Sequence, residues 1–148
     1  MKRRSIGPLG ALAGALILAG LVSCGKLSEL PTDPGSGDPI DETATFTRVK
    51  NEILSPTCAA IGCHGRVGVQ ENLQLTSDQA YANIVGHPSV ESSSLSRVTA
   101  GDPSNSYLYR KIVGSGITGD RMPQGGPYLT TEQIKLVRDW IRRGAPND

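Results

Sequence analysis

Apolar residues recur at helical spacing in several segments of the chain, and they nowhere alternate as in a half-buried strand. The first such segment covers residues 41–54. Its apolar residues Phe46, Val49 and Ile53 share one helical face. The pattern predicts an amphipathic helix, and Pro56 is expected to end it because proline cannot continue the α-helical hydrogen bonding.

The next two helices are predicted mainly from their ends. Residues 76–79 read Thr-Ser-Asp-Gln, which is a capping-box start, and Gly86 suits the C-terminal turn of the helix that follows. Residues 102–103 read Asp-Pro, which suits an N-cap with proline at the first helical position. That helix is expected to end at Gly114.

A second capping box at residues 130–133 opens the last predicted helix, and Gly144 closes it. Its apolar stripe is made by Ile134, Val137, Trp140 and Ile141. The predicted fold class is therefore all-α, with about four short helices joined by long loops. The two longest loops, 86–101 and 114–129, have a length that usually indicates function.

The N-terminal segment has the pattern of a targeting signal. Lys2, Arg3 and Arg4 precede an apolar stretch at residues 9–22, which has signal-peptide length and is short for a membrane span. The stretch ends in Leu-Val-Ser-Cys24, which resembles the bacterial lipobox. We predict a lipoprotein signal peptide at 1–23 and lipidation of Cys24. A general signal peptide with a chance cysteine, or an uncleaved anchor helix, remains an alternative.

Removal of residues 1–23 would take away three basic residues and no acidic ones. Of 15 Lys and Arg, 12 would remain against 14 Asp and Glu, a net charge of −2, so nothing supports a nucleic-acid surface. Residues 24–40 contain three prolines and three glycines in a polar context, which is typical of a flexible linker. The folded domain is predicted at 41–148.

The expected location is extracytoplasmic, on a lipid anchor in a bacterial membrane and facing the periplasm or the cell surface. Gly25 after the lipidated cysteine favours the outer membrane, by resemblance to other lipoproteins. Cysteine pairs in such a compartment can be oxidised or modified.

Candidate chemistry centres on Cys58, Cys63 and His64. Two cysteines with a histidine directly after the second are the arrangement of c-type haem attachment. The thiols add across the two haem vinyl groups, and the histidine is then held where its imidazole can ligate the iron. The pattern predicts one covalent haem c.

The spacer between the cysteines has four residues, whereas the common attachment motif has two. In a regular helix this spacing would aim the thiols apart, so a looped spacer is needed. Other interpretations remain open: a Cys58–Cys63 disulfide, a polar loop role for His64, or a zinc site. The zinc ligands would be Cys58, Cys63, His64 and His87.

A second axial ligand is suggested by Met122, the only methionine besides Met1. It lies in the Pro/Gly-rich loop 119–127, outside every apolar stripe. A thioether there has little to pack against unless it faces a cofactor, and Met/His ligation raises the reduction potential. His87 is the rival distal ligand, with an exposed loop role as its alternative.

These motifs, in this order, make residues 42–146 similar to bacterial class I cytochrome c-like domains, closest to the type found in lipid-anchored and planctomycete-type proteins. They comprise Cys58…Cys63-His64-Gly65, Gly101-Asp102-Pro103, Ser106-Tyr107-Leu108, Arg121-Met122-Pro123, Leu129-Thr130 and Trp140-Ile141…Gly144-Ala145. The resemblance implies a cytochrome c-like fold around one haem, with thioethers at Cys58 and Cys63 and axial ligands His64 and Met122.

The resemblance also implies that the first and last helices cross, with Phe46 near Trp140 and Ile141. The expected function is single-electron transfer by a membrane-anchored monohaem cytochrome, with redox proteins as partners and no enzymatic activity of its own. Two alternatives stay open. One is a non-haem interaction domain closed by a Cys58–Cys63 disulfide, and the other is a haem-containing sensor or complex subunit.

Overall fold

The computed structural model describes residues 38–76 and 78–148. The predicted signal peptide at 1–23, the lipidation site Cys24 and residues 24–37 of the predicted linker lie outside the described residues.

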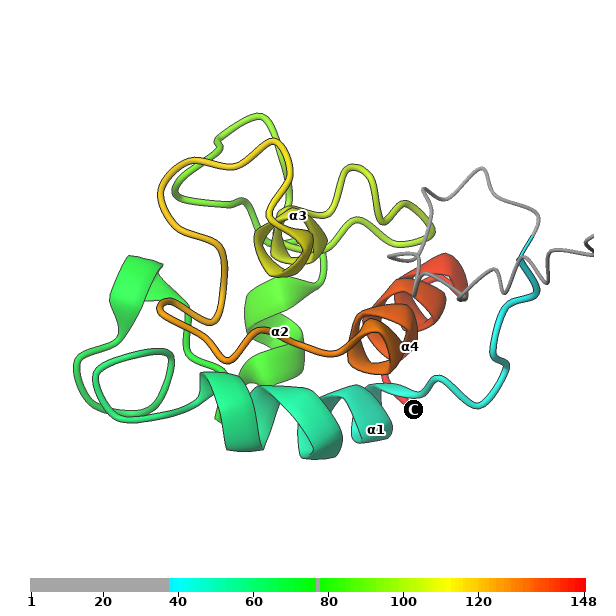
Figure 1. Ribbon diagram of the computed structural model, residues 1–148, viewed down its shortest axis with the longest axis horizontal. Coiled ribbons are helices and arrows are strands. Elements are labelled where there is room, and N and C mark those ends of the chain that lie inside the picture. Colours follow the sequence, from blue (N-terminus) through cyan, green and yellow to red (C-terminus); the bar gives the residue numbers. More distant parts are fainter. Residues whose placement is uncertain (1–37, 77) are drawn as a thin grey trace, which may run out of the picture.

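The described part of the chain is helical and contains no β-strand, only isolated bridges. This confirms the predicted all-α class, with long loops between the helices (Figure 1). The elements are α1 (Phe46–Val49), the π-helix η1 (Lys50–Cys58), the 3₁₀ turn η2 (Gln70–Asn72), α2 (Ala80–Ile84), α3 (Tyr107–Val113) and α4 (Thr131–Arg142).

The sequence predicted that Pro56 would end the first helix, and this prediction is wrong. The helix continues directly from α1 into the wider turns of η1, which include Pro56 and reach Cys58. In an α-helix the proline ring would collide with the carbonyl four residues earlier, and a wider turn spaces these groups differently. The last hydrogen bond of these wider turns spans five residues, from the Ala59 N–H to the Leu54 carbonyl at 2.9 Å.

The middle helices are shorter than predicted. The side chain of Thr76 does not cap α2, which begins at Ala80. Likewise α3 begins at Tyr107 instead of after the Asp-Pro pair, because the Asp102 carboxylate accepts the Asn105 N–H (3.1 Å) and closes a local turn. Short polar side chains commonly compete with helices in this way.

The predicted end of α3 and the predicted start of α4 are confirmed. Gly114 is the left-handed C-cap of α3, with φ of 80°. Thr130 and Gln133 form the reciprocal capping box of α4: the Gln133 N–H donates to Thr130 Oγ1 (3.3 Å) and the Thr130 N–H to Gln133 Oε1 (2.9 Å). Both motifs depend on neighbouring residues alone, which explains why the sequence predicted them.

The core is formed by residues of α1, η1, α2, α3 and α4 (Figure 1). The ring of Phe46 lies 5.5 Å from that of Trp140 and 5.1 Å from that of Tyr81, centroid to centroid. Trp140 is fully buried, and its indole N–H donates to the Pro146 carbonyl at 2.9 Å. The expected contact between Phe46 and Trp140 is therefore present.

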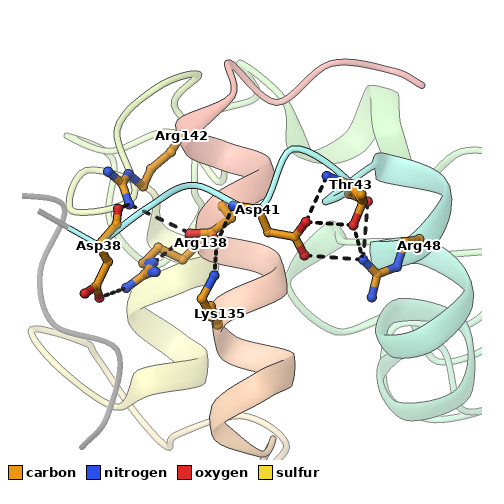
Figure 2. Close-up of polar contacts among 8 residues, drawn as sticks. Asp38, Asp41, Thr43, Arg48, Lys135, Arg138 and Arg142 are labelled. Atoms are coloured by element: carbon orange, nitrogen blue, oxygen red, sulfur yellow. Dashed lines mark hydrogen bonds and ion pairs between the residues drawn. The ribbon is translucent and has the colours of Figure 1, made fainter. Parts of the chain in front are cut away.

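The segment before α1 is held on α4 by a group of charged residues (Figure 2). Asp139 is fully buried on α4 and accepts hydrogen bonds from the Asp41 N–H (3.1 Å), from Lys135 and from Arg138 Nε (2.9 Å). Arg138 in turn reaches Asp38 at 3.3 Å. These contacts hold this segment on the last helix.

Candidate haem site

A cavity of about 540 Å³ opens on the side of the molecule away from the α1–α4 contact. Its walls come from the end of η1, the loop that follows it, η2, α3 and the two long loops on either side of α3. Cys58, Cys63, His64 and Met122 all line it. His87 is exposed and is not among the lining residues. The structure thus brings the four predicted haem residues together and leaves the rival ligand outside.

The four-residue spacer forms a loop, as its length required. Gly62 adopts a left-handed conformation (φ 81°) with open space around it. The Cys63 N–H donates to the Ala60 carbonyl (3.1 Å), and the His64 N–H donates back to the Cys58 carbonyl (3.2 Å). The helix therefore ends at Cys58, and the loop brings Cys63 back so that it lines the same cavity.

Gly65 allows this loop to close on itself. A Cβ at this position would lie 2.8 Å from the carbonyl oxygens of both Ala59 and Ala60. The Gly65 N–H meanwhile donates to the Ala60 carbonyl at 3.1 Å. A side chain here would push the spacer outward and displace the cysteines.

Both cysteines are free thiols in the structure, and their environments differ. Cys58 is half-buried and packs against the core, whereas Cys63 is exposed. Burial, with a smaller contribution from neighbouring Cys63, raises the pKa of the Cys58 thiol to about 11. Cys58 is therefore almost entirely protonated at neutral pH.

His64 is oriented by the backbone of the segment after η2. Its Nδ1 lies 3.0 Å from the Leu73 carbonyl oxygen. A carbonyl oxygen can only accept, so Nδ1 carries the proton and the lone pair of the neutral imidazole lies on Nε2. Such a bond is the usual outer-shell partner of a metal-ligating histidine.

Met122 is held at the C-terminal end of α3. Its N–H donates to the Lys111 carbonyl at 2.9 Å. Arg121 Nε donates to the Ile112 carbonyl (2.9 Å), and the Arg121 guanidinium lies 4.3 Å from the centre of the Tyr128 ring. This half-buried thioether is therefore held near α3 by its own backbone N–H and by the preceding side chain of Arg121.

The cavity also contains two buried cations that sequence reasoning missed. Lys111 is 7% exposed and bonds Glu91 (3.0 Å) and the Thr118 carbonyl (2.9 Å). Its position four residues after Tyr107, on the same helix face, was a signal that could have found it. Arg97 is 5% exposed, and burial lowers the pKa of its guanidinium. It lies in a loop, where no local pattern marks it.

The apolar part of the walls is formed by Leu73, Leu75, Leu108 and Ile112, and the acidic residues Glu71, Glu91 and Asp120 also line the cavity. Within residues 38–76 and 78–148, no three His, Cys, Asp or Glu side chains gather in a way that could hold a metal ion. The zinc arrangement with His87 is therefore not assembled. None of the helices in this same part of the chain is long and apolar enough to span a membrane.

Comparison with known proteins adds no relative: no family model, curated protein or solved structure matches this chain.

Proposed function

We propose that the chain is a lipid-anchored monohaem c-type cytochrome that carries single electrons. One observation carries this proposal: Cys58 and Cys63, which the sequence singled out as attachment sites, line one cavity together with the proposed iron ligands His64 and Met122. His64 and Met122 are 58 residues apart in the chain. Their meeting therefore depends on the fold, whereas Cys63 and His64 are neighbours in any fold.

The residues of the cavity suit a haem. Its volume lies within the range of about 300–1,000 Å³ that is usual for ligand pockets. The two thiols would hold the haem covalently, and His64 Nε2 and the Met122 thioether would be its iron ligands. When bound, the haem would supply a ferric–ferrous couple, and its potential would depend on these ligands and on burial.

The predicted anchor at Cys24 fits delivery of electrons to proteins at the same membrane. Asp38, the first described residue, comes fourteen positions after it. At about 3.5 Å per residue, the site could lie up to about 50 Å from the anchor. That distance would allow the domain to reach redox partners beside it.

The absorption spectrum in alkaline pyridine tests the proposal. Full-length protein from a host with haem-attachment machinery should give a reduced spectrum of the c type, with both vinyl groups saturated. Cys58→Ala and Cys63→Ala should each shift the band towards that of a haem with one free vinyl group. Cys24→Ala is the matched control, since it should release the protein from the membrane with its spectrum unchanged. Wild-type protein without covalently bound haem would overturn the proposal.

The sixth ligand is tested by Met122→Ala. Loss of the thioether should leave haem attachment intact, lower the reduction potential and let carbon monoxide bind the ferrous iron at neutral pH. His87→Ala is the control and should change none of these, because His87 lies outside the cavity. If the Met122 variant keeps the wild-type potential and ignores carbon monoxide, Met122 is not the ligand.

A further inference from the structure

The turn beside the candidate site has an unusual backbone. Glu71 and Asn72, two consecutive residues of η2, both adopt left-handed conformations, with φ of 51° and 50°. Residues with a Cβ avoid this region because of steric repulsion, although asparagine tolerates it better than glutamate. Such conformations persist where the surrounding structure enforces them.

The side chain of Arg97 is hydrogen-bonded to this turn. Its Nη2 donates to the carbonyls of both left-handed residues, Glu71 (3.0 Å) and Asn72 (3.2 Å). Its Nη1 donates to the Asn83 carbonyl at 2.8 Å, near the end of α2. The buried guanidinium therefore ties the turn to a helix of the core.

The next carbonyl after this turn belongs to Leu73, and it accepts the proton of His64 Nδ1. The Leu73 N–H donates to the Gln70 carbonyl (2.9 Å), so the Leu73 peptide continues directly from the turn. The backbone also returns to the histidine, since the Leu75 N–H donates to the His64 carbonyl at 2.7 Å. A change in the turn would therefore reach the imidazole through one peptide unit.

We propose that Arg97 is a positioning residue for His64. By holding residues 71–72 in the left-handed turn, it places the Leu73 carbonyl so that His64 keeps its Nδ1 proton and presents Nε2 to the cavity. The role of Nε2 as an iron ligand rests on the proposed function. The hydrogen bond itself can be measured whether or not haem is attached.

Lysine could not replace arginine in this role. The two terminal nitrogens of the planar guanidinium reach carbonyls from two separate segments, whereas the lysine ammonium is a single compact group. Arg97→Lys keeps the positive charge, so any effect on His64 would come from lost geometry and not from a changed field in the cavity.

The test is the exchange of the His64 Nδ1 proton with water, followed by nitrogen-15 NMR on the reduced full-length protein at fixed pH. Arg97→Lys should make this exchange about tenfold faster, the factor expected for loss of one hydrogen bond. Arg66→Lys is the matched control, because the Arg66 side chain is 71% exposed and its pairing with Asp78 spans 3.7 Å. Intact mass on each sample reports haem attachment separately, so failure of the proposed function is distinguished from failure of this inference.

Glycine at position 71 provides a rescue. Glu71→Gly removes the steric penalty of the left-handed conformation, so the turn should form without full help from Arg97. In the Arg97→Lys background it should restore slow exchange. An unchanged exchange rate in Arg97→Lys, or fast exchange in a folded double variant, would overturn the inference.

If Arg97→Lys does not fold, the single variant Glu71→Gly still tests the inference. In a chain that retains Arg97, this substitution should raise the thermal midpoint and leave the exchange of the His64 proton slow. A lower midpoint or fast exchange would contradict the strained turn on which the inference depends.

Discussion

The side of the molecule where α1 meets α4 and the side that holds the cavity are built differently. The first is filled by aromatic rings and closed by the ion pairs of the buried Asp139 with Lys135 and Arg138. The second consists mostly of loops and contains free thiols, buried cations and a left-handed turn next to a cavity of about 540 Å³. Under the proposed function, the packed side would supply folding stability and the cavity side would hold the ligand.

That division has a physical basis. Well-packed contacts such as that between Phe46 and Trp140 gain apolar burial and dispersion energy without any ligand. A cavity forgoes such contacts, so its walls must be held by hydrogen bonds from the backbone of neighbouring elements. The bonds of His64 to Leu73 and of Met122 to Lys111 are of this kind.

The largest effect on stability should come from removing a large side chain from the packed side. Trp140→Ala removes a fully buried indole and should lower the free energy of unfolding by about 4 kcal/mol. Ile61→Ala, at a site 83% exposed beside the cavity, should change it by less than about 0.5 kcal/mol. Urea denaturation measures both. A similar loss in the two variants would break the proposed division.

The second prediction concerns the buried carboxylate of Asp139. Burial by itself would raise the pKa of this group, but hydrogen bonds from Lys135, the Asp41 backbone and Arg138 outweigh it and hold the pKa below its ordinary value. A lowered carboxyl pKa contributes stability that is fully present above the unfolded value, about 3.9, and is lost as pH falls through the folded value. Asp139 should therefore stabilise the fold at neutral pH and less in acid.

Asp139→Asn should accordingly cost about 3 kcal/mol at pH 7, because it leaves the buried Arg138 with only the half-exposed Asp38 as its counter-charge. The difference from wild type should shrink as pH falls below about 4. Denaturation midpoints over a pH series measure this, with exposed Asp78→Asn as control. A constant difference down to pH 2 would show that the charge of Asp139 does not matter.

A smaller effect is expected at the cysteine loop. Gly65→Ala places a methyl group against two backbone carbonyls and should cost about 2 kcal/mol. Gly62→Ala has open space and only the cost of its left-handed backbone, about 1 kcal/mol. Thermal denaturation ranks the two variants. The reverse order would mean that the spacer does not close on Gly65 as described.

The sequence predicted those parts of the fold that depend on neighbouring residues. The apolar stripe and capping box of α4, the glycine end of α3 and the looped spacer before Cys63 are all local patterns. The prediction of Pro56 as a stop was wrong because the chain widened its helix instead of ending it. The predicted start of α3 was wrong because a local turn at Asp102 competes with the helix. The predicted start of α2 was wrong because the Thr76 hydroxyl donates to Asp78 and does not cap the helix.

The sequence predicted the chemical groups of the candidate site but not the side chains that position them. Cys58, Cys63, His64 and Met122 were singled out by residue type and spacing, and they share one cavity. The contacts of Arg97 with Glu71 and Asn83 span 26 and 14 residues, and no local pattern encodes them. Sequence reasoning therefore found the groups suited to holding a cofactor but not the side chains that orient them.

Intact mass of the mature protein, made in a host with haem-attachment machinery, tests the central proposal most directly. The predicted result is a mass equal to the lipidated or cleaved chain plus one haem, retained under denaturing conditions. A mass lower by two hydrogens, with no haem increment, would show a Cys58–Cys63 disulfide and contradict the assignment of this chain as a cytochrome.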